Sequence, residues 1–272
     1  MKNFLWVGVG ALVVTLVSGI AYYFWQPAAP PPVAATPPHP VVQAQQQPAP
    51  APTTPPKPVL ESPPSAPTPL PPLDRSDGFM MDALATLLHS KTLLHLFDSE
   101  AIISHLVATI DNLPRRVVPA NALPIQTPAG KFVVTGDEDH WAISEANAAR
   151  YAPYMRLVKA LDAQQLVALY VHGYPLFQKA YEGLGYPGQY FNDRVMVVLD
   201  DLLAAPEPAV PVSLTRPKVF YLYADPDLEQ RSAGQRQLMR MGPANERRVK
   251  QWLREIKAAL LTHLKMPPAP TP

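Results

Sequence analysis

The distribution of proline sets the strongest limit on how this chain can fold. Of the 36 prolines among its 272 residues, 19 fall between Pro27 and Pro72. Proline fixes φ and lacks a backbone N–H, so neither a helix nor a sheet can run through such a segment. We therefore predict that residues 27–72 are a disordered, proline-rich linker of extended, polyproline II-like character. Two interpretations stay open: a spacer, or a ligand for a proline-binding groove.

The N-terminal segment is apolar enough to cross a membrane. Residues 4–25 carry no charge, and a helix of that length would span roughly 33 Å, against about 30 Å for a bilayer core. Lys2 precedes this span and the next basic residue is Lys57. The positive-inside rule then predicts that residues 1–26 are a signal-anchor with a cytoplasmic N-terminus. The alternative is a signal peptide that is cleaved after Ala21.

Composition excludes several classes of protein. The chain has no cysteine, which excludes disulfides, thiolate catalysis and cysteine-ligated zinc. Its 23 basic and 22 acidic residues give a net charge of +1. That balance excludes a strongly basic nucleic-acid coat, so we expect no nucleic-acid partner.

From Leu73 onward the composition is that of a globular protein. We predict one compact, mainly α domain over residues 73–265 with a minor β element, followed by a disordered tail over residues 266–272. Ser99 is expected to cap a helix that places Ile102, Ile103, Leu106, Val107 and Ile110 on one stripe.

Later segments carry further start and stop signals. Asp162 and Gln165 resemble a capping box, and Pro175 is expected to kink or break the helix that follows. Another helix is expected over residues 192–203. A helix that begins at Asp225-Pro226-Asp227 is expected to run to Gly242.

The predicted last helix and strands complete the domain. The helix covers about residues 245–264 and buries Trp252 and Leu253 on one face. Residues 131–135 and 219–223 are short strand candidates, which would pair if they lie side by side.

Residues 173–194 form the most unusual segment. They hold four tyrosines, two phenylalanines, two prolines and four glycines. A tyrosine offers a flat apolar face and a polar tip, which suits stacking on a sugar or gripping a peptide. The candidate contact residues here are Tyr174, Tyr186, Tyr190, Asn192, Asp193 and Arg194. The alternative is a tightly packed helical corner in which Asp193 and Arg194 form internal ion pairs.

Charge is unevenly divided along the domain. Residues 73–230 hold 12 basic and 19 acidic residues, a net −7, whereas residues 231–265 hold 9 basic and 2 acidic residues, a net +7. Either the two parts neutralise each other in the fold, or the last helix meets an anionic lipid, wall polymer or protein. The candidate residues for such a contact are Arg247, Arg248, Lys250 and Arg254.

Catalytic and metal-binding patterns are absent from the sequence. There is no G-x-S-x-G or H-E-x-x-H. The densest set of metal-ligand types is Asp137–His140, which fails as a calcium loop because Ala142 stands where glycine is needed. We predict a solvated acidic turn there, and no catalytic, cofactor-binding or metal site in the chain.

Three separated stretches resemble one bacterial family. They are YPLFQKAYEGLGYPGQYFNDR, LLAAPEP and RPKVFYLYADPDLEQRSAGQRQLMRMGPAN. In this order they are similar to the family catalogued as domain of unknown function 3014. The resemblance covers about residues 73–264 and implies a membrane span and a proline-rich segment before the domain. It implies no activity, cofactor or catalytic residue.

A second likeness concerns the stretch from Ser232 to Leu253. Fragments of it are similar to lytic transglycosylases of the lysozyme type, which need a glutamic acid with a raised pKa. Here Glu229 is followed by Gln230 rather than serine, and it lies only five residues before Gly234, so both order and spacing depart from that family.

These observations lead to one functional expectation. The chain is expected to be a single-pass inner-membrane protein, held in the lipid bilayer through residues 4–25, with a periplasmic and non-enzymatic interaction domain. Its partner would be an envelope protein or a cell-wall polymer. The alternative is a peptidoglycan-binding or lytic-transglycosylase-like wall-active protein.

Overall fold

The computed structural model describes residues 59–60, 69–137 and 140–265. The predicted membrane span over residues 4–25, most of the linker and the C-terminal tail lie outside them. Among the described residues, no helix combines the length and the apolarity needed to span a bilayer. The described residues all belong to one compact unit, residues 55–272.

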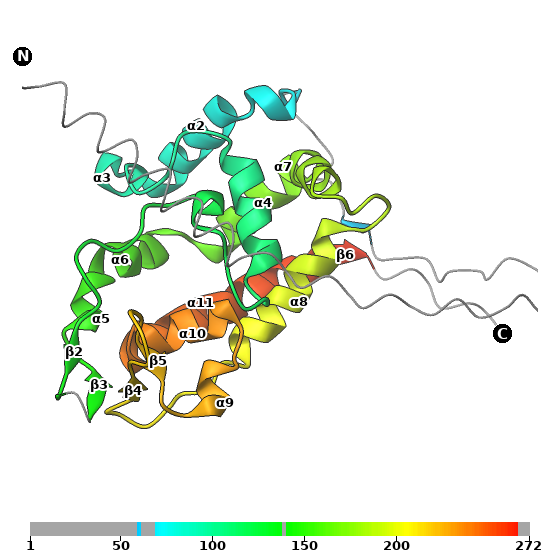
Figure 1. Ribbon diagram of the computed structural model, residues 1–272. Helices are drawn as coiled ribbons and strands as arrows, with labels where there is room; N and C mark the ends of the chain where they lie inside the picture. The colour runs from blue at the N-terminus through cyan, green and yellow to red at the C-terminus, as the bar shows by residue number, and fades with distance from the viewer. Residues whose placement is uncertain (1–58, 61–68, 138–139, 266–272) are drawn as a thin grey trace, which may run out of the picture. The chain divides into compact units, whose positions relative to one another are not determined.

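The described chain is mainly helical (Figure 1). Its helices are η1 (Leu73–Arg75), α2 (Asp77–Leu88), α3 (Lys91–Leu94), α4 (Ile102–Asn112), η2 (Ala120–Ala122), α5 (Asn147–Arg150), α6 (Ala152–Ala160), α7 (Ala163–Gly183), α8 (Phe191–Leu203), α9 (Pro226–Glu229), α10 (Ala233–Arg240) and α11 (Pro243–Thr262). Its strands are β1 (Val59–Leu60), β2 (Val134–Thr135), β3 (Trp141–Ile143), β4 (Ser213–Thr215), β5 (Leu222–Tyr223) and β6 (Leu264–Lys265). The prediction of a mainly α domain with a minor β element is confirmed.

The four strands β2, β3, β4 and β5 form one antiparallel sheet in that order. The register pairs Val134 with Ile143, Trp141 with Leu214, and Leu214 with Tyr223. The two predicted strand segments therefore contribute β2 and β5, which lie at opposite edges and do not pair with each other. β1 and β6 pair separately.

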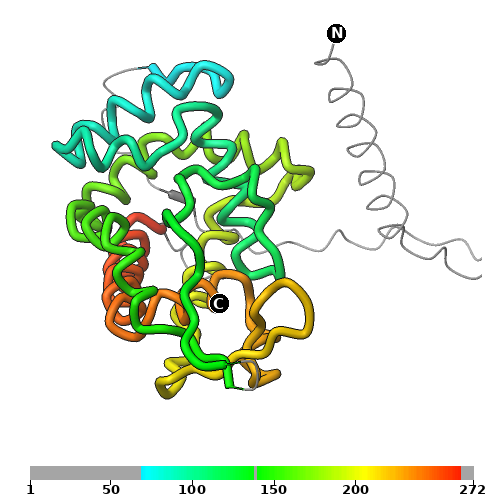
Figure 2. Tube along the Cα trace, turned by 60° about the vertical axis from the view of Figure 1, so that its left-hand side comes forward, coloured from blue at the N-terminus to red at the C-terminus, as the bar shows by residue number. Residues whose placement is uncertain are grey.

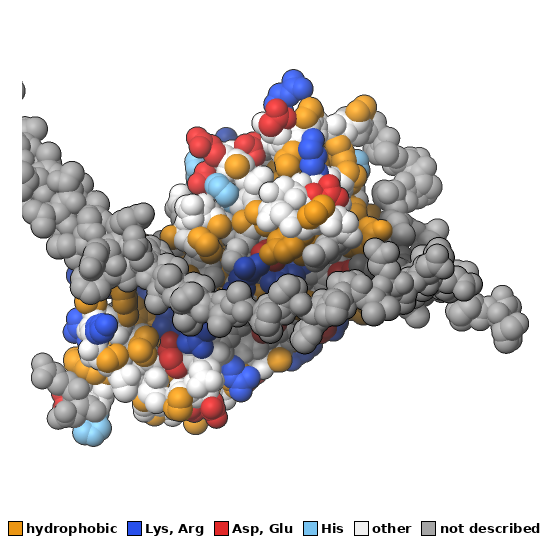
Figure 3. All heavy atoms as spheres, turned by 45° about the vertical axis from the view of Figure 1, so that its right-hand side comes forward, with side chains coloured by type: hydrophobic (Ala, Val, Ile, Leu, Met, Phe, Trp, Pro, Cys, Tyr) orange, Lys and Arg blue, Asp and Glu red, His pale blue; other side chains and the backbone are white. Residues whose placement is uncertain are grey.

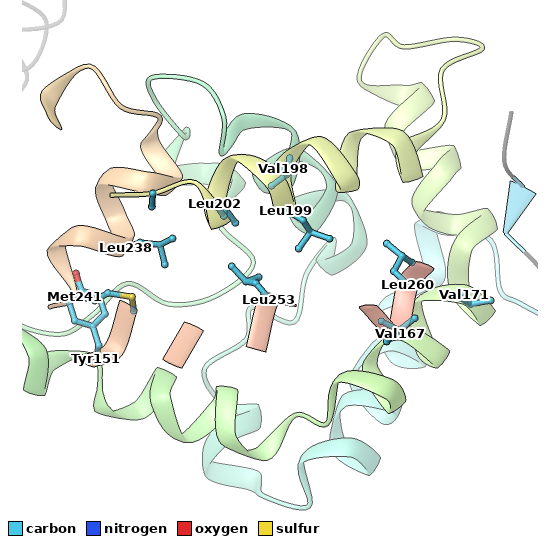
Figure 4. Packing of buried hydrophobic residues seen from close by; sticks show 12 residues of the cluster. Tyr151, Val167, Val171, Val198, Leu199, Leu202, Leu238, Met241, Leu253 and Leu260 are labelled. Atoms are coloured by element: carbon cyan, nitrogen blue, oxygen red, sulfur yellow. The ribbon is translucent and has the colours of Figure 1, made fainter. Parts of the chain in front are cut away.

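Apolar residues from distant helices meet in the largest cluster of the core (Figure 4). Val167 and Val171 of α7, Leu199 of α8 and Leu253 and Leu260 of α11 are all buried there. A second cluster joins α2, α4, α7 and the start of α8. In Figure 2, helices α2 and α3 lie at one end of the domain and the small sheet lies at the other.

The start of α4 differs from the predicted one. Ala101, and not Ser99, is its N-cap, with a left-handed φ of 48°. The carboxylate of Asp77 accepts the backbone N–H groups of Ala101 (2.9 Å) and Ile102 (3.0 Å). The prediction of Ser99 as the cap is wrong because a side chain from α2 satisfies these donors instead. The predicted stripe of the helix is confirmed, since Ile102, Ile103 and Val107 are buried.

The long helix α7 starts as predicted but does not break. The Asp162 side chain accepts from the backbone N–H of Gln165 (2.9 Å). The helix then continues through Pro175 to Gly183 as one element. Packing against α4 and α11 holds the helix on both sides of the proline, which offsets the missing hydrogen bond.

The segment from Asp225 forms two helices rather than one. Asp225 caps the short α9, accepting from the N–H of Asp227 (2.8 Å). The chain then leaves the helix, and Ser232 caps α10 by accepting from the N–H of Gln235 (3.1 Å). The serine hydroxyl also donates to the carboxylate of Asp201 in α8 (2.7 Å), and this tertiary contact fixes the interruption.

Candidate functional site

Two glycines and one glutamine build the turn between α7 and α8. Gly185 and Gly188 have φ values of 98° and 72°, a conformation that residues with a Cβ rarely adopt. The side chain of Gln178 donates to a carbonyl of the turn (2.8 Å) and accepts from the backbone N–H of Phe191 (2.9 Å). Tyr190, the N-cap of α8, makes no side-chain cap. Gln178 therefore supplies the acceptor that the start of α8 needs.

Beside this turn, the carboxylate of Asp111 joins three side chains. Asp111 lies near the end of α4, and its side chain is only 5% exposed. Its Oδ1 lies 2.9 Å from Nε of Arg194, and its Oδ2 lies 2.7 Å from Nη2 of Arg115. The Tyr186 hydroxyl donates to Oδ2 (3.2 Å) and accepts from Nη2 of Arg115 (2.6 Å). We call Asp111, Arg115, Tyr186 and Arg194 the Asp111 network.

The opposite charges within the Asp111 network stabilise one another. The negative charge of Asp111 raises the pKa of the Arg115 guanidinium. Burial raises the pKa of the neighbouring Tyr181 hydroxyl. Charge-assisted contacts of this kind hold planar groups in fixed orientations.

A shallow cavity of about 300 Å³ lies over the Asp111 network. Gln189, Tyr190, Asp193 and Val197 complete its walls, and we call it the corner pocket. Tyr190 is 43% exposed and Val197 is 53% exposed. The four charged residues of its lining, two aspartates and two arginines, sum to zero. Tyr181 contributes a ring stacked on that of Tyr186, with centroids 4.6 Å apart.

The structure brings together four of the six residues expected in this segment. Tyr186, Tyr190, Asp193 and Arg194 all line the corner pocket, whereas Tyr174 and Asn192 do not. The Tyr174 hydroxyl donates to Gln178 (3.0 Å), and burial raises its pKa to about 12. Asn192 is buried, so it is not part of an exposed surface. The alternative of internal ion pairs also holds for Arg194, which pairs with Asp111.

The basic residues of α11 are placed in different environments. Lys250 is buried, so it does not belong to an exposed surface. Its Nζ donates to the Ala205 carbonyl (2.5 Å) and lies 2.9 Å from Oε1 of Glu246. Arg247 lies 3.5 Å from Glu207.

Acidic side chains therefore neutralise part of the basic helix. Lys257 pairs with Asp200 of α8. Arg248 and Arg254 are exposed, and within the part of the chain that the structure describes they have no ion-pair partner. Figure 3 shows a face of the domain on which acidic, basic and hydrophobic side chains are interspersed. This arrangement agrees with mutual neutralisation across the fold.

A larger cavity of about 820 Å³ lies between the small sheet, the segment before β4 and the start of α11. Two of its buried polar side chains, those of Asn147 and Glu246, contact other groups of the protein. Asn147 accepts from the N–H of Val133 (3.0 Å) and donates to two backbone carbonyls. Glu246 pairs with Lys250, although burial raises its pKa. The corner pocket, with an exposed aromatic rim, is the better candidate for recognition.

The residues considered for catalysis or metal binding are not arranged for it. Both carboxylate oxygens of Glu229 are occupied, by Arg236 (2.6 Å) and by the backbone N–H of Tyr223 (2.9 Å). His140 lies 3.6 Å from Asp137 in an exposed turn. Among the described residues, no group of three or more His, Asp or Glu side chains could hold a metal ion.

Sequence reasoning missed the floor of the corner pocket. Asp111 and Arg115 come from the end of α4 and lie 75 and 71 residues from Tyr186 in the chain. The one available signal was that Asp111 occupies a buried position of an otherwise apolar helix stripe. A buried carboxylate needs a cationic partner from elsewhere in the fold.

Comparison with protein families identifies one that matches this chain. The family model described as Protein of unknown function (DUF3014) matches residues 102–257, from α4 to α11. No curated protein and no solved structure matches the chain significantly. The matched range covers more than half of the 272 residues and contains the whole corner pocket. The chain belongs to the DUF3014 family of proteins of unknown function.

Proposed function

We propose that this chain is a single-pass inner-membrane protein that displays a non-enzymatic interaction domain in the periplasm. The uncharged segment over residues 4–25, with Lys2 before it, supports the anchor and its orientation. The proline-rich residues 27–72 support a tether, which gives the domain reach away from the membrane.

The corner pocket is the observation that carries the interaction role. Its floor consists of charged groups that hold each other in place, and its rim exposes Tyr190 and Val197. Leu184, at the end of α7, is also exposed. Exposed apolar and aromatic side chains beside arginine are typical of recognition surfaces.

Binding fits this pocket better than catalysis does. A general acid or base must be free to exchange a proton with its substrate. The carboxylate of Asp111 is held by Arg115, Arg194 and Tyr186 together. Asp111 is therefore suited to fixing its neighbours, not to transferring protons.

A topology experiment tests the membrane part of the proposal. We expect a C-terminal alkaline phosphatase fusion to be active and a C-terminal green fluorescent protein fusion to be dark. The mature protein should keep residues 1–26. The opposite reporter pattern, or an N-terminus at Tyr22, would contradict the anchor.

Crosslinking in cells tests the binding part. A photo-reactive amino acid replaces Tyr190, and a matched variant carries it at Phe220, which is 78% exposed and lies outside the corner pocket. We expect envelope adducts from position 190 that are absent or different at position 220. Identical adducts from both positions would show that the corner is not a recognition surface.

A second candidate function is action on the cell wall. The exposed ring of Tyr190 beside fixed polar groups favours glycan binding over glycan cleavage, because Glu229 is occupied by Arg236 and Tyr223. Incubation of the protein with purified peptidoglycan separates the two. Co-sedimentation without released muropeptides would support binding, and released muropeptides that vanish in Glu229→Gln would support the enzyme.

A further inference from the structure

We propose that the corner pocket binds one uncharged sugar ring of a polysaccharide. This inference rests on the proposed function, because it names the class of ligand for the same site. Four properties of the pocket support it: its charge balance, its fixed polar groups, its exposed aromatic ring and its size.

Charge balance selects against strongly charged ligands. Asp111 and Asp193 are opposed by Arg115 and Arg194 among the lining residues. A phosphate or a basic peptide would therefore meet a like charge on some wall of the pocket. A neutral sugar ring carries no charge, and its hydroxyl groups, like the amide of an acetamido sugar, both donate and accept hydrogen bonds.

Fixed polar groups lower the cost of binding such a ring. Arg115 uses Nη2 for Asp111 and Tyr186, and its Nε and Nη1 donate to no other described residue. The side-chain amide of Gln189 likewise has no partner within the described residues. Because Asp111 already orients the guanidinium of Arg115, a ligand would not have to order that group.

The exposed ring of Tyr190 provides a surface for stacking. One face of a sugar ring presents C–H groups, and an aromatic face accepts such groups with little loss of side-chain freedom. Tyr190 and Val197 both line the corner pocket and both are exposed. The pocket therefore offers an aromatic ring for the apolar face of a sugar and polar side chains for its hydroxyl groups.

Size favours a sugar over a protein partner at this site. The volume of about 300 Å³ is at the lower end of the range of ligand pockets. A cavity of this volume suits one sugar ring. A stable protein interface usually needs about 1,000 Å² or more of buried surface, and the corner exposes only three large apolar residues among those described, Leu184, Tyr190 and Val197.

Binding of two neutral oligosaccharides to the full chain tests the inference. The protein is placed in lipid nanodiscs, because detergents with sugar headgroups would compete. The probes are chitotetraose, which carries acetamido groups, and cellotetraose, which does not. Affinity is measured by isothermal titration and by saturation-transfer NMR.

The variants separate stacking from folding. We expect Tyr190→Ala to weaken binding by roughly tenfold, the upper end of an aromatic contact, and Tyr190→Phe to bind like the wild type. Arg115→Gln should also weaken binding. Phe220→Ala is the matched control, an exposed aromatic outside the pocket, and should leave affinity unchanged.

The binding measurements distinguish the sugar-binding inference from the proposed interaction role. Binding of either probe that depends on Tyr190 and Arg115 supports the inference, and a preference for chitotetraose assigns an acetamido sugar. Lack of binding by the wild type, or equal affinity of Tyr190→Ala and Tyr190→Phe, overturns it. If sugars do not bind but Tyr190 crosslinks to an envelope protein, the glycan inference falls and the interaction role stands. If both fail, the proposed function falls as well.

Discussion

Replacing Asp111 by alanine removes the acceptor on which the corner pocket depends. The substitution leaves the guanidinium groups of Arg115 and Arg194 without their carboxylate and the Tyr186 hydroxyl without its acceptor. We expect the domain to lose stability and the pocket floor to lose its fixed geometry.

The size of the loss follows from how well each partner can return to water. Removing one member of a fully buried ion pair costs about 3–5 kcal/mol. The side chain of Arg194 is 22% exposed and that of Arg115 is 49% exposed, so both can be partly rehydrated. We therefore expect Asp111→Ala to lower the free energy of unfolding by about 2–3 kcal/mol, and Asp111→Asn, which keeps shape and one acceptor, by about 1–2 kcal/mol.

Double-mutant cycles apportion this loss between the two arginines. Urea unfolding of residues 55–272 is followed by far-ultraviolet circular dichroism. We expect a coupling of about 1–2 kcal/mol between Asp111 and Arg194, and about 0.5 kcal/mol with the more exposed Arg115. A loss below about 0.5 kcal/mol for Asp111→Ala, or a stronger coupling to Arg115 than to Arg194, would refute the reasoning.

Three further predictions concern the rest of the domain. Asp77→Ala should cost about 1–2 kcal/mol because it frees the backbone N–H groups of Ala101 and Ile102 at the start of α4. Ser99→Ala should be nearly neutral, and equal effects of the two substitutions in urea unfolding would contradict the role of Asp77 as the acceptor. Burial raises the pKa of the Glu246 carboxyl group above its ordinary value of 4.5. The folded chain therefore binds the carboxyl proton more tightly than the unfolded chain does. As a result, the free energy of unfolding should fall as the pH rises from 4.5 through the raised pKa. The Glu246→Gln variant should lack this fall in stability. The prediction is contradicted if the urea midpoints of the variant and the wild type change equally with pH between about pH 4 and pH 8. Gly234→Ala should cost about 1–2 kcal/mol, since its Cβ would lie 2.5 Å from a leucine methyl of α8, while Gly183→Ala, which has nothing within 4 Å, should not lower the thermal midpoint.

Helices could be predicted where the signal is local. The apolar spacing of α4, α8 and α11 lies within each segment, and tertiary packing agrees with it. Asp162 and Asp225 cap helices two or three residues away. Such contacts depend on the adjacent sequence alone, so they can be recognised without the fold.

Features that depend on distant partners could not be predicted. The donors of α4 are satisfied by Asp77, 24 and 25 residues earlier, so a plausible local cap such as Ser99 was preferred. The interruption before α10 depends on the contact of Ser232 with Asp201. Strands β3 and β4 are each three residues long, too short for an alternating pattern to emerge.

In the corner pocket too, local residues could be predicted from the sequence and residues from distant segments could not. The tyrosine-rich segment 173–194 predicted the exposed residues of the pocket. The buried part requires Asp111, which is 83 residues from Arg194 in the chain. Because the floor is fixed by ion pairs that also stabilise the fold, changes there cost stability. Gln189 and Val197 are exposed and can change at little cost to folding. We therefore expect variants that alter ligand preference without unfolding the domain to arise at these two positions.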